Sequence, residues 1–377
     1  MATPPWVILG RHILAEHAAA AAPDFTLPVA PPPRVIIVAA GRGAHPDHDR
    51  PDQHPYIIAA APDFLLANFA VAPSVGSHFD DDPPDSHLVV LRHFVTAEGR
   101  TTAVAESVPD RGADDVPNLL NIGSVGIIPH DQGGYIIVDL QVRKGSDLAT
   151  LAFFISGSGD PDPEWLPPES VRSPLPELDR NRKWNPHGVV FTKTTLWCFD
   201  LSWGILSCDI QEGDQGLLFH PLPYMRALSE AEAQAMQEVV LNRRCVTVSQ
   251  GQLRYVEIIP VPVLSADGAE DGEEVTVSMW TMGFGDGQSR WEWNYIVKFE
   301  QIWNDDSYRA TRLPRNVPVL AVVSPSDPNL VYFSLQQRLF GVNMREHRVV
   351  HDEGYDLMMN NPGLEAAGRF VLAWDRR

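Results

Sequence analysis

The sequence predicts an all-β fold, a β-propeller of six blades, with five or seven blades as alternatives. One observation is the stretch Val189 to Asp209, which forms three short apolar runs separated by two tight turns. Looser copies of this unit recur along the chain, and one unit cannot bury its own apolar face, so stacked copies are expected. The last observation is a lone apolar run, Phe370 to Trp374, near the C-terminus. Two separate β domains are the runner-up architecture.

Five internal units follow one another, and each contains about four short apolar runs. The turn Asp131–Gly134 in the second unit is a hairpin signal, because its glycines tolerate positive φ. Pro-spaced residues 157–176 read as an edge strand of that unit, since proline cannot donate to a ladder. The predicted strands by unit are 55–61, 64–71, 87–95 and 101–109; 124–130, 135–142 and 149–156; 188–193, 195–201, 203–210 and 216–223; 244–249, 253–258, 274–282 and 291–299; and 317–323, 330–335, 338–344 and 347–352.

The lone C-terminal run predicts how the ring closes. Propellers remove an exposed edge by completing one blade with strands from both chain ends, so Phe370 to Trp374 is expected to pair with an early strand such as Val35 to Val38. We therefore expect residues 1–34 to be an N-terminal extension with a Pro-rich connector, and residues 35–377 to be a single propeller. Residues 228–241 predict one short helical insertion, in which Ser229 and Glu232 fit a capping box.

Composition limits the partners and the compartment. The net charge of −20 argues against nucleic acid or an anionic membrane as the main partner, because both favour a basic surface. The three cysteines do not fit a disulfide framework or a zinc site, which suggests reduced core residues. We find no uninterrupted apolar run of about 20 residues, no basic leader and no glycosylation acceptor. A soluble protein of the cytoplasm or nucleus is expected.

Long ordered motifs resemble one known family. They are WCFDLSWGILSCD (residues 197–209), QGQLRYVEI (250–258), VTVSMWTM (275–282) and the run from FEQIWNDDSYRATRLPRNV to REHRVV (299–350), with WVILGRHI near the N-terminus. These motifs are similar to the plant domain-of-unknown-function family 1618, which is expanded in grasses. The resemblance implies a β-propeller-like domain, related in style to the domains that follow F-boxes, with no established activity. Residues 1–34 do not supply an F-box.

The sequence offers no convincing chemical motif. The densest polar cluster is His45, Asp47, His48, Asp49, Asp52 and His54, in a Pro-broken loop, and a solvated loop is a better interpretation than a metal site. ISGSG (155–159) lacks the first glycine of a nucleophile elbow, and GFGDG (283–287) lacks the Lys-Ser/Thr of a phosphate loop. We therefore assign no catalytic, cofactor-binding or metal-ligating residue, expect no cofactor, and leave the binding residues open.

The most economical functional hypothesis is a non-catalytic scaffold that binds a protein or peptide as a regulatory or adaptor module. It rests on fold analogy alone. The tryptophans and tyrosines of the C-terminal half are expected to fill the blades, with a solvent-facing aromatic platform as the alternative. The alternative function is an enzyme, a hydrolase or glycan-processing activity, at the mouth of the central channel. Converging His and carboxylates would favour the enzyme, and a channel mouth of small apolar residues would oppose it. A monomer is expected.

Overall fold

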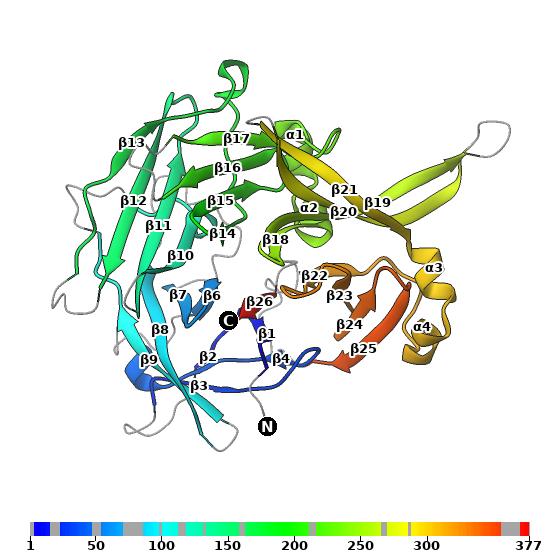
Figure 1. Cartoon of the computed structure of the whole chain (residues 1–377), viewed down its shortest axis with the longest axis horizontal. Helices are drawn as coiled ribbons and strands as arrows, with labels where there is room; N and C mark the ends of the chain where they lie inside the picture. Colours follow the sequence, from blue (N-terminus) through cyan, green and yellow to red (C-terminus); the bar gives the residue numbers. More distant parts are fainter. Residues whose placement is uncertain are drawn as a thin grey trace.

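Six β-sheets surround a common centre in the computed structural model, which confirms the predicted six-bladed β-propeller (Figure 1). The structure describes residues 4–15, 23–46, 54–70, 86–97, 100–111, 118–130, 133–157, 163–210, 216–264, 270–285, 288–355 and 370–376. Each four-stranded blade is antiparallel and runs in chain order from the centre to the rim, as a repeated unit requires.

Blades 1 to 5 correspond to the five units expected from the sequence. Their strands are β6 (His54–Ala61), β7 (Phe64–Ala70), β8 (Ser86–Ala97) and β9 (Arg100–Ser107) in blade 1; β10 (Val125–His130), β11 (Gly134–Val142), β12 (Leu148–Ser156) and β13 (Glu169–Arg172) in blade 2; β14 (Gly188–Thr192), β15 (Thr195–Asp200), β16 (Gly204–Asp209) and β17 (Leu218–Pro221) in blade 3; β18 (Arg244–Ser249), β19 (Gln252–Leu264), β20 (Glu270–Gly285) and β21 (Gln288–Lys298) in blade 4; and β22 (Val319–Val323), β23 (Leu330–Leu335), β24 (Arg338–Asn343) and β25 (Arg348–Gly354) in blade 5.

Blade 6 closes the ring with strands from both chain ends, but not with the expected partner. Strand β26 (Val371–Asp375) pairs antiparallel with β1 (Trp6–Gly10), in register from Trp6 opposite Asp375. The expected partner, Val35 to Val38, instead supplies β4 (Val35–Ile36), which pairs parallel with the other edge of β1. The five residues of β1 are all buried, as expected for a strand that lies between β26 and β4.

The N-terminal residues expected to form an extension are thus part of the sheets. Besides β1, strands β2 (Leu14–Ala15), β3 (Phe25–Pro28) and β5 (Ala39–Ala40) join the outer edge of blade 1, where β3 pairs with β9. This makes a seven-stranded sheet and shields the rim of that blade. Among the described residues, short 3-10 helices lie in the connections at Arg42–Ala44, Ile122–Ser124 and Glu177–Asp179.

The core consists of layers between neighbouring blades. In β15, Leu196 and Cys198 pack with residues of blade 2, whereas Trp197 and Phe199 pack toward blade 4. Because side chains alternate along a strand, a blade packed on both faces needs apolar residues at every position. Cys198 and Cys208 are buried, and none of the three cysteines forms a disulfide.

The helices differ in part from the one expected. The segment predicted over 228–241 is two short helices, α1 (Glu230–Ala235) and α2 (Gln237–Arg243), and the capping box of Ser229 and Glu232 is present. The break lies at Met236, whose ψ of 17° departs from helical geometry. Two further helices, α3 (Phe299–Asn304) and α4 (Asp306–Thr311), connect blades 4 and 5. No helix of the described residues is long and apolar enough to cross a membrane.

Candidate functional site

The inner strands of the blades line a pocket of about 290 Å³ in the channel. Its walls come from the first strands of blades 1 to 4 and from β26. They are formed mainly by small and apolar residues, including Ala59, Ala60, Ala61, Gly126, Ile127 and Val190. Asp375 is the single titratable residue of this lining. The His and carboxylate cluster that general acid–base catalysis needs is therefore absent from this described part of the channel.

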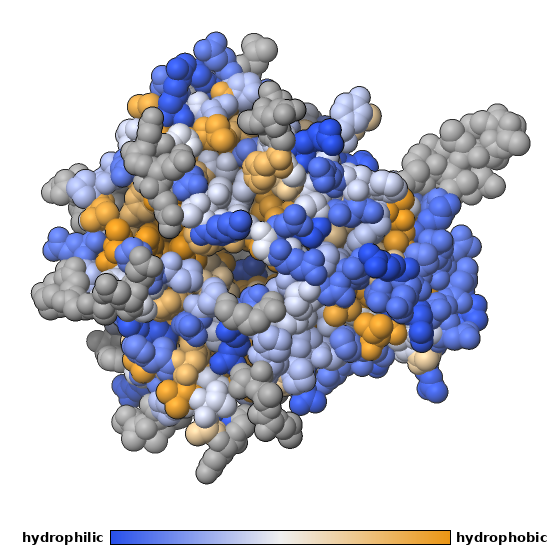
Figure 2. Space-filling model, in the orientation of Figure 1, coloured by the Kyte–Doolittle hydropathy of each residue, from blue (hydrophilic) through white to orange (hydrophobic). Residues whose placement is uncertain are grey.

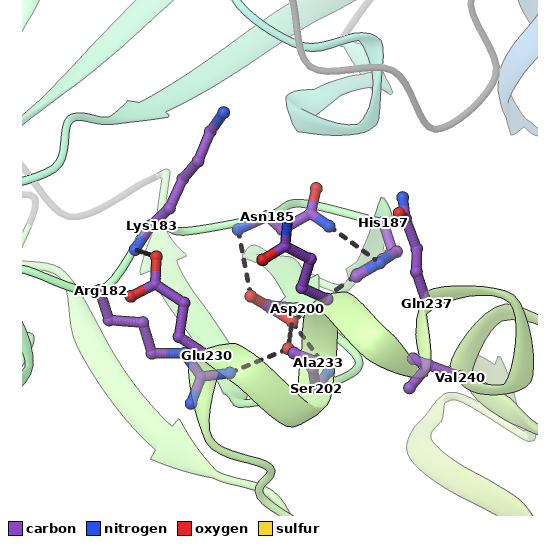
Figure 3. A pocket seen from close by; sticks show the side chains of 11 residues that line it. Arg182, Lys183, Asn185, His187, Asp200, Ser202, Glu230, Ala233, Gln237 and Val240 are labelled. Atoms are coloured by element: carbon purple, nitrogen blue, oxygen red, sulfur yellow. Dashed lines mark hydrogen bonds and ion pairs between the residues drawn. The ribbon is translucent and has the colours of Figure 1, made fainter.

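A second pocket, of about 270 Å³, is polar and lies between blade 3 and the helices that follow it (Figure 3). Three segments far apart in sequence meet there. They are residues 182–187 before β14, the turn 200–202 after β15, and residues 230–240 of α1 and α2. Figure 2 shows that hydrophilic and hydrophobic residues are interspersed over the face of the molecule viewed in Figure 1.

Asp200 forms the floor of this polar pocket. Its Oδ1 accepts hydrogen bonds from the backbone N (2.8 Å) and the Oγ (2.6 Å) of Ser202, and its Oδ2 accepts one from the backbone N of Asn185 (3.1 Å). Burial raises the pKa of the Asp200 carboxyl, although these donors oppose the shift. The bonds tie the turn after β15 to the segment that enters β14, so the carboxylate has a structural role.

His187 lies beside Asp200, but the two do not form a catalytic dyad. The Nδ1 of His187 accepts a hydrogen bond from the backbone N of Leu201 at 3.1 Å, and it lies 3.8 Å from Oδ1 of Asp200. A dyad needs the proton on Nδ1 so that it can be donated to the carboxylate. Here the Nδ1 lone pair accepts the hydrogen bond from the backbone N–H of Leu201. The imidazole therefore stabilises the turn after β15.

The same polar arrangement recurs in blades 2, 3 and 4. An arginine from the connection entering each blade stacks on a tryptophan of that blade and is linked to a carboxylate on its second strand. In blades 2 and 4 the arginine forms an ion pair with the carboxylate. In blade 3 the arginine donates a hydrogen bond to the Ser202 hydroxyl, which in turn donates one to the carboxylate. The sets are Arg111, Asp139 and Trp165; Arg182, Asp200 and Trp203; and Arg226, Glu257 and Trp280.

The recurrence in three blades indicates that these buried charges are structural and do not mark a catalytic site. Arg111 Nη1 lies 2.6 Å from Asp139 Oδ2, and both side chains are nearly inaccessible. Burial also raises the pKa of Glu257, with Arg244 and Arg226 opposing it. Such pairing offsets the desolvation of each charge. These groups therefore attach the connections to the blades.

The connection after blade 3, residues 222–243, carries exposed apolar side chains, and its helices α1 and α2 form one wall of the polar pocket. Tyr224 is 90 % exposed and Met225 is 78 % exposed, and Met236 and Val239 are also exposed. Met225 has a φ of 62°, a left-handed conformation that is unusual for a residue other than glycine. Helix α1 has no buried residue. Leu222 and Val240 of the same segment are buried in the core between blades 3 and 4, so Tyr224, Met225 and α1 are its surface part.

The candidate residues and motifs considered in the sequence analysis do not come together in the structure. His45 is buried against Phe69, with ring centroids 5.2 Å apart, whereas residues 47–53 of the polar cluster lie outside the described residues. No group of three metal-ligating side chains occurs in the part of the chain that the structure describes. Residues 155 and 156 of ISGSG end β12 and residues 283–285 of GFGDG end β20, whereas residues 158–159 and 286–287 lie outside the described part of the chain.

Most tryptophans pack in the blades. Trp197 and Trp203 are buried, but Trp293 on the outer strand of blade 4 is 63 % exposed. The polar pocket itself was missed in the sequence, because its three segments are separated by up to about 40 residues and carry no common motif. The FDLSWG motif was the available signal, since an Asp followed by Ser two residues later favours an Asx turn.

Comparisons with known proteins identify a family but no activity. The model of a family described as "Protein of unknown function (DUF1618)" matches residues 197–332, which supports membership and confirms the resemblance. No curated protein matches the chain. Similar solved structures include an α-L-arabinanase of Penicillium chrysogenum complexed with arabinobiose (10% identity, TM-score 0.35, covering 78% of each chain). They also include AztD of Citrobacter koseri (12%, TM-score 0.27, covering 82% of this chain and 71% of that one) and the polysaccharide lyase Uly1 (9%, TM-score 0.26, covering 77% and 74%). Similarities this low carry no argument about activity.

Proposed function

We propose that this chain, whose residues 197–332 match the DUF1618 family, is a non-catalytic propeller scaffold that binds a protein or peptide partner. The contact surface is residues 222–243 together with the polar pocket beside them. The partner places an apolar side chain against Tyr224 and Met225 and a polar group in the pocket. The scaffold acts in the cytoplasm or nucleus, where the three cysteine thiols would stay reduced.

The observation that carries the proposal is the exposure of Tyr224 and Met225 on the connection between blades 3 and 4. Tyr224 and Met225 are adjacent in the chain and both strongly exposed, and tyrosine and methionine are enriched in binding surfaces. The left-handed φ of Met225 adds local strain, which concentrates at binding sites. The polar lining of the adjacent pocket supplies hydrogen-bond partners that give orientation.

The channel supports a non-catalytic role. An enzyme at the channel mouth needs a nucleophile or an acid–base pair within reach of substrate. The lining of small and apolar residues offers none in the part described, and Asp200 and His187 are engaged in holding a turn. No observation favours the hydrolase or glycan-processing alternative.

The test is partner capture with a matched pair of variants. The tagged protein is purified from its native tissue as wild type, as Tyr224→Ser/Met225→Ser, and as Val350→Ser, a half-exposed apolar residue of blade 5. Mass spectrometry identifies what is reproducibly recovered, and the interaction is then measured with purified components. We expect the double variant to lose at least about tenfold in affinity while Val350→Ser binds normally. Recovery of no reproducible partner, or equal binding by all three proteins, would contradict the proposal.

A further inference from the structure

Strand β21 is an outer strand with an open edge. It has one neighbour, β20, in the sheets formed by the described residues. It is 11 residues long and contains no proline, whereas the outer strands β13 and β17 have four residues each and β17 ends in Pro221. Outer strands are usually short or interrupted, because their free N–H and C=O groups can pair with another chain. Strand β21 lacks that protection over most of its length.

The charges of β21 are self-complementary. Arg290 and Glu292 are both exposed and lie two residues apart, so they project from the same face of the strand. When two copies of β21 pair antiparallel about Trp291, Arg290 of each copy lies opposite Glu292 of the other. Directly opposite side chains on paired strands are about 5 Å apart and interact favourably when their charges are opposite. Symmetry forms this pair twice.

The same register covers exposed aromatic side chains. Trp293 is 63 % exposed and Phe284 is 70 % exposed. Phe284 is opposite Ser289 within blade 4, and Trp280 is opposite Trp293, so Phe284 and Trp293 share one face of the sheet. In the pairing about Trp291, Trp293 of one copy lies opposite Ser289 of the second copy and beside the Phe284 of that copy. Each copy thus covers two exposed aromatic groups of the other.

The bulge in β21 limits where the pairing can occur. The ladder with β20 shifts between Met279 and Trp280, which leaves Asn294 without an opposite residue. A bulge bends its strand and ends regular pairing. The segment of β21 that can pair regularly with a second chain is therefore Gln288 to Trp293, and Trp291 is near the centre of this segment.

We propose that two copies of this chain associate by antiparallel pairing of their β21 strands about Trp291, which joins two four-stranded blades into one continuous sheet. This dimer differs from the monomer expected from sequence. It uses the rim of blade 4, and it does not depend on the proposed partner surface at residues 222–243.

Charge reversal tests the pairing. The oligomeric state of the full chain is measured by sedimentation over a wide range of concentration. We expect a concentration-dependent dimer that Arg290→Glu or Glu292→Arg alone weakens at least about tenfold, because each reversal places like charges opposite each other at both symmetric positions. The combined swap Arg290→Glu/Glu292→Arg is expected to restore the dimer. Arg345→Glu and Glu346→Arg, on an exposed turn of blade 5, are the matched controls.

A disulfide measurement tests the register independently. Chains carrying Arg290→Cys and Glu292→Cys are mixed and oxidised, and a cross-linked dimer is expected from the mixture but not from either chain alone, because the two positions face each other. The wild type controls for the three native thiols. A monomer at every concentration would overturn the proposal. A dimer that is insensitive to the single reversals, or that the combined swap does not restore, would also overturn it. The same holds if either cysteine variant alone cross-links as strongly as the mixture.

Discussion

His220 on β17 joins blades 3 and 4 and should make the stability of the protein depend on pH. Its side chain is 4 % exposed, its Nε2 lies 2.6 Å from Oγ of Ser207, and its Nδ1 lies 2.5 Å from Oγ of Ser289. Burial lowers the pKa of His220 from the ordinary 6.5 to about 4. The folded state therefore holds a neutral imidazole at pH values where the unfolded chain is protonated.

The expected loss of stability follows from this difference. Above pH 6.5 neither state binds the proton, so the full stability is present. As the pH falls below 6.5, the unfolded state gains a proton that the folded state resists, and stability is lost progressively down to about pH 4. Between pH 7 and pH 5 the contribution of His220 is a loss of about 2 kcal/mol.

Denaturant unfolding of the wild type and of His220→Gln at several pH values measures this contribution. The other titrating groups are common to both proteins, so the difference between their pH profiles isolates His220. We expect the variant to be less stable at pH 7 and to lose about 2 kcal/mol less than the wild type on going to pH 5. Between pH 7 and pH 8 the difference between the proteins should stay constant. Equal losses in the two proteins below pH 6.5 would refute the reasoning.

Three further outcomes are expected. Arg111→Met should cost about 3–5 kcal/mol of unfolding free energy, because it leaves the buried Asp139 without its cation and with only the neutral donors Ser124 and Gln141, and adding Asp139→Asn should recover part of this; no recovery would argue against the pair. Gly204→Ala should cost about 1–3 kcal/mol, since a Cβ would lie 2.4 Å from a neighbouring aromatic ring, whereas Gly354→Ala meets nothing within 4 Å and should be neutral in thermal unfolding. Ser229→Ala should speed amide exchange across α1, because its cap is lost, and leave global unfolding unchanged; a large global effect would contradict the peripheral placement of α1.

The repeat pattern was enough to predict the blades. Each apolar run bounded by turn residues became a strand. Short segments of β-branched and aromatic residues favour the extended backbone, and they supply apolar side chains to both buried faces of a blade. Val189 to Asp209 forms β14, β15 and β16 as expected. Helices α3 and α4 were not predicted, since six residues are too few to show a helical period.

The choice of closing strand needed the tertiary structure. Trp6–Gly10 and Val35–Ile36 are both apolar, and both lie in blade 6. Which of them contacts β26 depends on the geometry of the whole ring, because pairing between chain ends is not encoded by local periodicity.

The sequence by itself determined the strands of the five internal blades and the cap of α1, which depend on neighbours within a few residues, and it favoured six blades over five or seven. Only the tertiary structure decided which residues of distant segments meet. It brought Asp200 to Asn185 and Ser202, left Tyr224 and Trp293 exposed, and lined the channel with small apolar side chains. These features depend on contacts between segments that are far apart in the chain, and the proposed binding surfaces are built from such segments.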